Sequence, residues 1–279
     1  MKRVRLIALD MDGTLLSSDH QTIPQENIDA IRHATAEGIR VCICTGRMLE
    51  DASDFITTRL QLPCMIIACN GTRISDGPLP KGHILYRRSF EPEDAKRVLD
   101  LVLPYRIMIN GFEDGRVNTV AFASGQHYHL TDRGLIDASY GEKAIYEAAQ
   151  RGIMKFYISA DGYAGASTSK NIEDARKAVM SAFPELQITQ SAPGNIEIMP
   201  KDANKGTALE FLAQFLDLER EQVMAMGDAE NDLSMLKYAY HSVAMANGTQ
   251  IVKSICRYQT ESNDQCGVAK MIDRVLESK

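Results

Sequence analysis

The chain has 279 residues, of which 44% are hydrophobic and 24% are charged, so it can bury one large core or two unequal ones. A formal net charge of −6, without a Lys/Arg cluster that would follow a phosphate backbone, argues against general nucleic-acid binding. The basic start is followed by an apolar run that Asp10 interrupts. That run is too short for a signal peptide or a membrane span, so a cytoplasmic protein without membrane contact is expected.

Six cysteines are present, and none forms a Cys-x-x-Cys pair or has the histidine spacing of a zinc site. This pattern predicts reduced thiols rather than a disulfide framework. Cys42 and Cys44 alternate within one predicted strand, so they are expected on the same face of a sheet.

Two carboxylates follow the first apolar segment. Residues 4–9 are almost continuously apolar, which is typical of a parallel strand covered on both faces. Asp10 and Asp12 come directly after it, at the carboxyl edge where open α/β sheets place their ligands. Gly13 favours a turn there. A plain polar turn and a calcium loop are competing interpretations, although leucines stand where a calcium loop needs further oxygen ligands.

The first third of the chain alternates between strand and helix patterns. A helix is predicted over residues 24–34, a strand over 39–44, a helix over about 49–60 and a strand over 65–68. The second strand ends in Thr45-Gly46-Arg47 and the third in Asn70-Gly71-Thr72. This β-α-β-α-β order favours a parallel sheet with right-handed crossovers.

The pattern changes between about residues 81 and 190, where a second, α+β unit is expected. Its predicted elements are a helix over 92–103, strands over 106–110 and 154–160, and a helix over 172–183. Polar turn-forming segments near 75–78 and 191–195 are the expected crossings between the units. A core of residues 1–80 and 191–279, with residues 81–190 inserted as a second domain, is therefore predicted.

After the second crossing the first pattern is predicted to resume. Its elements are a strand over 196–199, a helix that opens with Lys205-Gly206 and runs to about 216, a strand over 223–226, and a short strand over 242–245. The strand over 223–226 runs into Gly227-Asp228-Ala229-Glu230-Asn231-Asp232. Acids and an amide thus gather again at the end of a strand.

Four polar segments now stand at strand ends or helix starts of one predicted sheet: Asp10 with Asp12, Thr45 with Gly46, Lys205, and Asp228 with Asn231 and Asp232. In this order they resemble the four sequence motifs of the haloacid dehalogenase superfamily. The insertion is similar to the large α+β (C2B-type) cap of the Cof-type phosphatases. The resemblance implies an α/β fold with a Rossmann-like parallel-sheet core and an inserted α+β cap domain that sets substrate specificity.

The resemblance also assigns roles. Phosphoryl transfer needs a nucleophile, charge neutralisation and a proton for the leaving group. Asp10 is expected to be the nucleophile that forms an aspartyl-phosphate, and Asp12 the general acid and base. Clustered carboxylates and a phosphate substrate point to Mg²⁺. Its expected ligands are Asp10, Asp228 and the main-chain carbonyl of Asp12, with Asp232 holding the metal-bound waters. The phosphoryl oxygens are expected to be bound by Lys205, Thr45, Gly46, Asn231 and the backbone N–H of Met11.

The implied function is a Mg²⁺-dependent phosphatase of a small phosphorylated metabolite, such as a sugar phosphate, pyridoxal phosphate or a flavin-pathway phosphate. A sugar phosphomutase and a catalytically silent regulatory ligand-binding protein are the alternatives. A monomer or a small homo-oligomer fits either class of enzyme.

Considered one at a time, the same residues have ordinary interpretations. Lys205 fits a lysine at the start of a helix, Thr45 with Gly46 fits a turn, and Asp228 fits a helix cap. For Arg47, contact with a substrate or cap and a plain salt bridge both remain open. The six histidines share no motif and are interpreted as structural or surface residues. Ala246-Asn247-Gly248 departs from the more usual Gly-Asn-Ala of the family, which affects the loop near the site.

Overall fold

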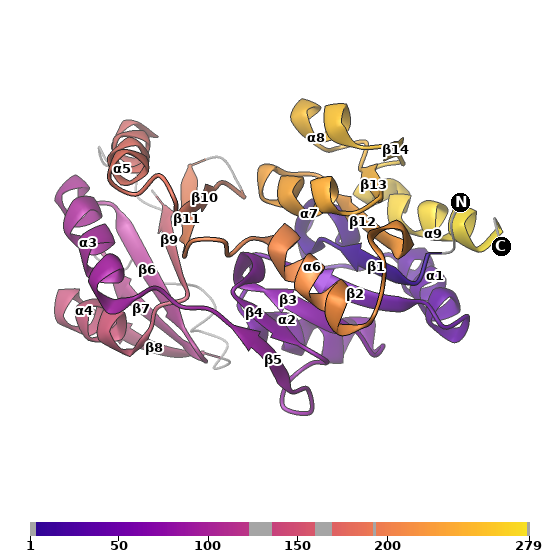
Figure 1. Cartoon of the computed structure of the whole chain (residues 1–279), viewed down its shortest axis with the longest axis horizontal. Coiled ribbons are helices and arrows are strands. Elements are labelled where there is room, and N and C mark those ends of the chain that lie inside the picture. The colour runs from indigo at the N-terminus through magenta and orange to yellow at the C-terminus, as the bar shows by residue number, and fades with distance from the viewer. Residues whose placement is uncertain (1–3, 123–135, 160–168, 192–193, 278–279) are drawn as a thin grey trace. The chain divides into compact units, whose positions relative to one another are not determined.

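The computed structural model describes residues 4–122, 136–159, 169–191 and 194–277, which form two compact units (Figure 1). Unit 1 consists of Met1–Arg87 and Asn204–Lys279, and unit 2 of Arg88–Ala203. Unit 2 is therefore inserted between two segments of unit 1. None of the described helices combines the length and the apolar character needed to cross a membrane.

Unit 1 is built on an eight-stranded sheet with the strand order β14-β13-β12-β1-β2-β3-β4-β5. Six of these strands run parallel, while β4 and β5 pair antiparallel at one edge. The strands are β1 (Leu6–Leu9), β2 (Arg40–Cys44), β3 (Met65–Ala68), β4 (Arg73–Ser75), β5 (Ile84–Arg87), β12 (Val223–Gly227), β13 (His241–Ala244) and β14 (Tyr258–Gln259). The helices are α1 (Gln25–Ala36), α2 (Leu49–Phe55), α6 (Lys205–Phe215), α7 (Leu233–Tyr238), α8 (Gln250–Ile255) and α9 (Gly267–Glu277).

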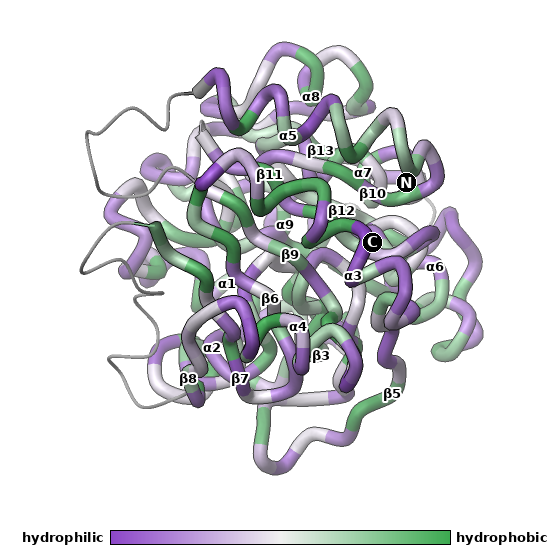
Figure 2. The backbone as a smooth tube through the Cα atoms, turned by 90° about the vertical axis from the view of Figure 1, so that its left-hand side faces the viewer, coloured by the Kyte–Doolittle hydropathy of each residue, from purple (hydrophilic) through white to green (hydrophobic). Residues whose placement is uncertain are grey.

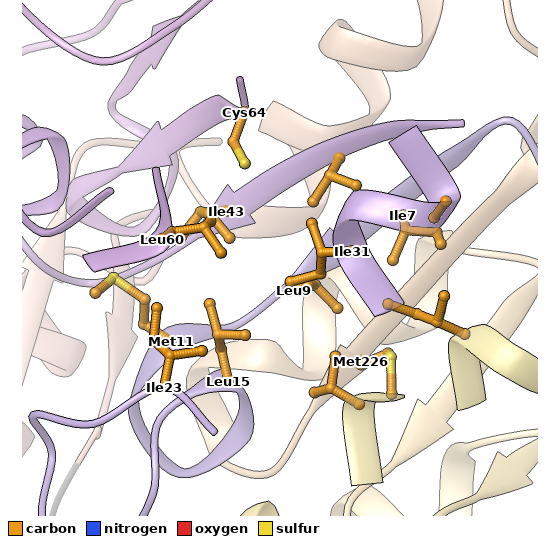
Figure 3. Close-up of a cluster of buried hydrophobic side chains, with 14 of the residues drawn as sticks. Ile7, Leu9, Met11, Leu15, Ile23, Ile31, Ile43, Leu60, Cys64 and Met226 are labelled. Carbon is orange, nitrogen blue, oxygen red and sulfur yellow. The ribbon is translucent and has the colours of Figure 1, made fainter. Parts of the chain in front are cut away.

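Strand β1 is apolar at every position because helices cover both faces of the sheet. Ile7 and Leu9 pack into one cluster with residues of α1, α2 and α9, whereas Leu6 and Ala8 pack with residues of α6, α7 and α8. Figure 3 shows the first cluster, in which Ile31 of α1 lies beside Leu9. Each such side chain contributes about 1.5–3 kcal/mol through burial. The neighbouring strand β12 is coloured hydrophobic in Figure 2 for the same reason.

Unit 2 is an α+β unit built on a six-stranded sheet of order β10-β11-β9-β6-β7-β8. Its strands are β6 (Met108–Glu113), β7 (Arg116–Val120), β8 (Asp137–Tyr140), β9 (Lys155–Ser159), β10 (Gln187–Thr189) and β11 (Asn195–Met199), and its helices are α3 (Pro92–Val102), α4 (Glu142–Arg151) and α5 (Ser169–Ala182). One face of the sheet packs on these helices through an apolar core of its own, in which Phe156 and Ile158 of β9 take part.

The α/β fold class with an inserted α+β unit is confirmed, but the unit boundaries differ from the predicted ones. The division falls at Arg87/Arg88 and at Ala203/Asn204, not near residues 80 and 190. The turn at residues 75–78 does not leave the first sheet, because β5 returns to pair antiparallel with β4. Strand β11, predicted to resume the core pattern, pairs with β9 and β10 in the sheet of unit 2. The segment near 75–78 leads into a strand of the unit 1 sheet, and the segment near 191–195 leads into a strand of the unit 2 sheet. Neither segment therefore marks the passage to the other unit.

Candidate active site

Strand pairing brings the acids together at the carboxyl edge of the unit 1 sheet. Strands β1 and β12 are parallel neighbours, with Leu9 opposite Met226, so the residues that follow them meet. The backbone N–H of Asp10 donates to the Met226 carbonyl at 3.1 Å. Side-chain oxygens of Asp10, Asp228 and Asp232 lie within 4.8 Å of one another. Three of the predicted site residues therefore form one cluster.

Lys205 is a fully buried cation within this cluster. Its Nζ donates to Oδ1 of Asp10 at 2.5 Å and to Oδ1 of Asp232 at 2.6 Å. Burial alone would lower the pKa of Lys205, but the two carboxylates outweigh that effect and raise it, so the side chain stays charged. The residue before Lys205 packs closely against the loop after β3, since a Cβ at Gly71 would lie 2.3 Å from the Asn204 carbonyl oxygen. Only glycine permits this approach.

The electrostatics of the cluster favour a divalent cation. Three carboxylates against one ammonium group leave two negative charges in excess. Burial is the largest cause, and repulsion from Asp232 the next, of two raised pKa values. The pKa of Asp10 lies well above its ordinary value, and that of Asp228 is about 7. The donors are all carboxylate oxygens, which suit a hard cation such as Mg²⁺. The residues present therefore fit the predicted metal.

Asp232 and Asp228 are held in place by different contacts. Oδ2 of Asp232 accepts the backbone N–H groups of Asp228 and Ala229 at 2.9 and 3.1 Å, so this carboxylate shapes its own loop. Oδ1 of Asp228 accepts the Thr14 hydroxyl at 2.8 Å. A Cβ at Gly13, where φ is +84°, would lie 2.5 Å from Oδ2 of Asp228. The first loop thus depends on glycine for its approach to Asp228.

Arg47 forms a salt bridge with Asp12. Its Nε and Nη2 donate to the two oxygens of Asp12 at 2.8 and 2.6 Å, and its Nη1 donates to Asp51 at 3.3 Å. His20, interpreted from the sequence as structural or surface, lies with Nδ1 3.3 Å from Oδ1 of Asp12. Burial alone would raise the pKa of Asp12, but the bonds from Arg47 outweigh it and lower the pKa.

The four predicted phosphate-binding residues other than Lys205 also lie in unit 1. Thr45 is buried directly after β2, and its hydroxyl accepts the Arg47 backbone N–H at 3.1 Å, with Gly46 between them. The amide of Asn231 donates to Oδ1 of Asn70 at 3.3 Å. The side chain of Met11 packs into the apolar core in Figure 3, so only its backbone is left for the site.

Three asparagines hold the loop that carries Asp10 and Asp12; the sequence pointed only to Asn247, through its unusual segment, and did not mark the other two as site residues. Each donates its side-chain amide to a different carbonyl of that loop, and all three connect it to other parts of unit 1. The bonds run from Asn247 to the Gly13 oxygen at 2.7 Å, from Asn27 to Leu15 at 3.3 Å and from Asn263 to Leu16 at 2.9 Å. Asn247 also accepts the Asn263 backbone N–H at 3.0 Å. The unusual Ala246-Asn247-Gly248 segment therefore anchors the first loop.

Replacing Asn247 tests this anchoring. Asn247→Asp removes the donor to the Gly13 carbonyl and sets a carboxylate against that oxygen, so we expect kcat to fall by about tenfold or more through misplacement of Asp10. KM and the thermal midpoint should change little, since Asn247 is exposed. Steady-state kinetics check this, with Gln214→Glu, an exposed position on α6 with the same charge change, as the control. Equal effects of the two variants would contradict the anchoring role.

Comparison with known proteins places this site in a family. Residues 7–272 match the haloacid dehalogenase-like hydrolase family. A haloacid dehalogenase-like hydrolase from Bacillus subtilis superposes with a TM-score of 0.82 at 26% identity, covering 97% of this chain and 99% of that one. A haloacid dehalogenase-like hydrolase from Bacteroides thetaiotaomicron superposes with a TM-score of 0.80 at 24% identity, with 98% and 100% covered, and shows the fold alone.

Two curated relatives from Bacillus subtilis carry more specific names. The 5-amino-6-(5-phospho-D-ribitylamino)uracil phosphatase YcsE is 34% identical over 96% of this chain and 94% of its own length. The phosphatase YwtE, named for the same substrate, is 31% identical over 98% of each chain. The chain thus belongs to the haloacid dehalogenase-like hydrolase family, as the four motifs predicted. It is an enzyme of the phosphatase class.

Proposed function

We propose that this protein hydrolyses a phosphate monoester of a small metabolite through covalent transfer of the phosphoryl group to Asp10. The observation that carries the proposal is the buried Asp10 carboxylate, paired with Lys205 and within 4.8 Å of two further acids at the end of a parallel strand. Such a group is positioned for attack while neighbouring cations offset the charge of the incoming phosphate.

In the first step an oxygen of Asp10 attacks phosphorus, and the bond between phosphorus and the ester oxygen breaks. Asp12 donates a proton to the departing alkoxide, and the aspartyl-phosphate remains on Asp10. Lys205, the Thr45 hydroxyl, Gly46, Asn231 and the backbone N–H of Met11 are proposed to bind the phosphoryl oxygens.

In the second step Asp12 takes a proton from water, which attacks phosphorus. The bond to Asp10 breaks, so inorganic phosphate leaves and the Asp10 carboxylate is restored. Asp10, Asp228 and the main-chain carbonyl of Asp12 would hold Mg²⁺, with Asp232 orienting its waters. When bound, the ion supplies neutralisation of the phosphate charge.

The substrate proposed for the first test is 5-amino-6-(5-phospho-D-ribitylamino)uracil, because two relatives above 30% identity are named for its hydrolysis. A third relative at 29% identity is named HMP-PP phosphatase. We propose that unit 2, as a cap domain, selects among such substrates, while unit 1 carries the reacting groups.

A phosphate-release assay over a panel of phosphate esters tests the proposal. The panel comprises the ribitylaminouracil phosphate, sugar phosphates and pyridoxal phosphate, each measured with Mg²⁺ and with EDTA. We expect at least one substrate to release inorganic phosphate only when Mg²⁺ is present. Formation of an isomeric sugar phosphate without free phosphate would instead identify a mutase, and binding without turnover a regulatory protein.

The role of Asp12 predicts a dependence on the leaving group. Asp12→Ala should slow hydrolysis of an alkyl phosphate by about 10²–10⁴-fold, since its alkoxide needs a proton, and that of 4-nitrophenyl phosphate much less. Single-turnover rates of alcohol release and of 4-nitrophenol release, which report the first step alone, measure this. Equal losses for both esters would argue against proton donation by Asp12.

The raised pKa values predict how Mg²⁺ affects stability. In the metal-free protein Asp228 has a pKa of about 7, above the 3.8 of an ordinary aspartate, so between these values the folded state binds a proton that the unfolded state lacks. The contribution of Asp228 to the stability of the metal-free protein therefore falls as pH rises from about 4 to 7. Mg²⁺ should raise the thermal midpoint more at pH 8 than at pH 5.5. Differential scanning fluorimetry checks this, and an equal shift at both pH values would contradict it.

A further inference from the structure

A cavity lies in unit 1 at the amino ends of β12, β13 and β14, whereas Asp10 and Asp228 follow the carboxyl ends of their strands. Its volume is about 480 Å³, within the range of small-molecule sites. The lining residues are Arg220, Leu236, Lys237, Ala239, Tyr240, Ser242, Ile255, Cys256 and Arg257. None of them belongs to the candidate active site.

The lining of this cavity carries positive charge, although the chain as a whole is negatively charged. The chain carries a net charge of −6, yet three lining residues are cationic and none is an aspartate or glutamate. Across the described ranges, no salt bridge joins Arg220, Lys237 or Arg257 to a carboxylate. The cations of the lining are therefore not paired with a carboxylate in the described part of the chain, although Glu210 and Glu221 lie close enough to act on the neighbouring Tyr238. Such a lining favours an anionic ligand.

Both arginines are held in defined positions. Arg220 donates through Nε and Nη2 to the carbonyls of Tyr238 and Lys237, at the end of α7. The guanidinium of Arg257 stacks on the Tyr240 ring, 4.0 Å from its centroid, and its backbone N–H donates to the Ser242 hydroxyl at 3.1 Å. A stacked guanidinium keeps its in-plane donors available for a phosphate, sulfonate or carboxylate group. Little side-chain entropy remains to be lost on binding.

Part of the wall is apolar. Leu236 and Ala239 are buried, and Ile255 is half-buried. We propose that this cavity binds a small organic anion whose acidic groups pair with Lys237 and Arg257 and whose apolar body rests on this wall. The proposal does not depend on the reaction at Asp10.

Isothermal titration calorimetry with naphthalene-1,5-disulfonate tests the proposal. This probe has two acidic groups on an apolar ring and is no phosphate ester, so the enzyme does not turn it over. We expect one site, which the double variant Lys237→Gln, Arg257→Gln weakens by about tenfold or more. The control Arg40→Gln, Lys270→Gln removes two exposed positive charges elsewhere in unit 1 and should leave the affinity within about twofold.

A second variant tests the wall while keeping the cations. Ile255→Glu sets a carboxylate at the apolar surface and should weaken binding by a similar factor, with thermal unfolding confirming that the protein remains folded. Naphthalene-1,5-diol, which lacks the charges, should bind at least tenfold more weakly than the disulfonate. Asp10→Asn should not alter the affinity. Unchanged binding in the Lys237/Arg257 variant, or equal weakening by the control pair, would overturn the proposal.

Discussion

Asp10→Asn is expected to reduce kcat by about 10⁴-fold or more, because the amide oxygen cannot accept the phosphoryl group. The fold should persist. Burial and repulsion from Asp232 already raise the pKa of Asp10, so the folded state holds this carboxylate at a cost near pH 7. The metal-free variant is therefore expected to be at least as stable as the wild type, and phosphate release together with thermal unfolding measures both effects.

The matched control for this variant is Asp29→Asn, which makes the same chemical change on the exposed side of α1. It should leave kcat within about twofold of the wild type. The Mg²⁺-induced rise of the thermal midpoint should shrink in Asp10→Asn and persist in Asp29→Asn. Turnover by purified Asp10→Asn at a rate near that of the wild type would refute the nucleophile assignment.

Lys205→Met is the second substitution with a large expected effect. It leaves the buried Asp10 and Asp232 without their ammonium partner, which is expected to lower the free energy of unfolding by about 3–5 kcal/mol. It should also lower kcat by about 10²–10³-fold, because the phosphoryl oxygens lose a cationic donor. Denaturant unfolding and steady-state kinetics below the midpoint of the variant separate the two effects.

Unit 2 offers a control with the same physics. Lys155 and Glu197 form an ion pair that is equally buried, with Nζ 2.6 Å from the carboxylate oxygen. Lys155→Met should therefore destabilise the protein by a similar amount, while kcat at low temperature stays within about threefold of the wild type because Asp10 and its partners are untouched. A comparable loss of kcat in both variants would show that Lys205 acts through stability alone.

Much of the site was predictable because its chemistry lies in short segments that end buried strands. An apolar run followed by Asp10 and Asp12 defines a strand and its carboxyl edge locally, and the same holds for β12 and Asp228. A parallel sheet then brings these edges together. The alternating order of elements in unit 1 was predictable for the same reason.

Other features depend on long-range contacts that no local pattern contains. Residues 196–199 have a strand pattern that fits either sheet, and only their pairing with β9 and β10 assigns them to unit 2. The bond from Asn263 to the Leu16 carbonyl joins residues 247 positions apart. Asn27 is different, since it stands in helical register with the buried Ala30, Ile31 and Ala34. A polar residue at the head of an apolar helix face was a signal for a buried hydrogen bond.

The most direct test of covalent transfer to Asp10 is mass spectrometry of enzyme quenched in acid during turnover of a good substrate with Mg²⁺. We predict one phosphoryl group on the peptide that contains Asp10, absent when substrate is omitted and absent from Asp10→Asn. A phosphoryl group on a different residue, or steady turnover by Asp10→Asn, would contradict the account.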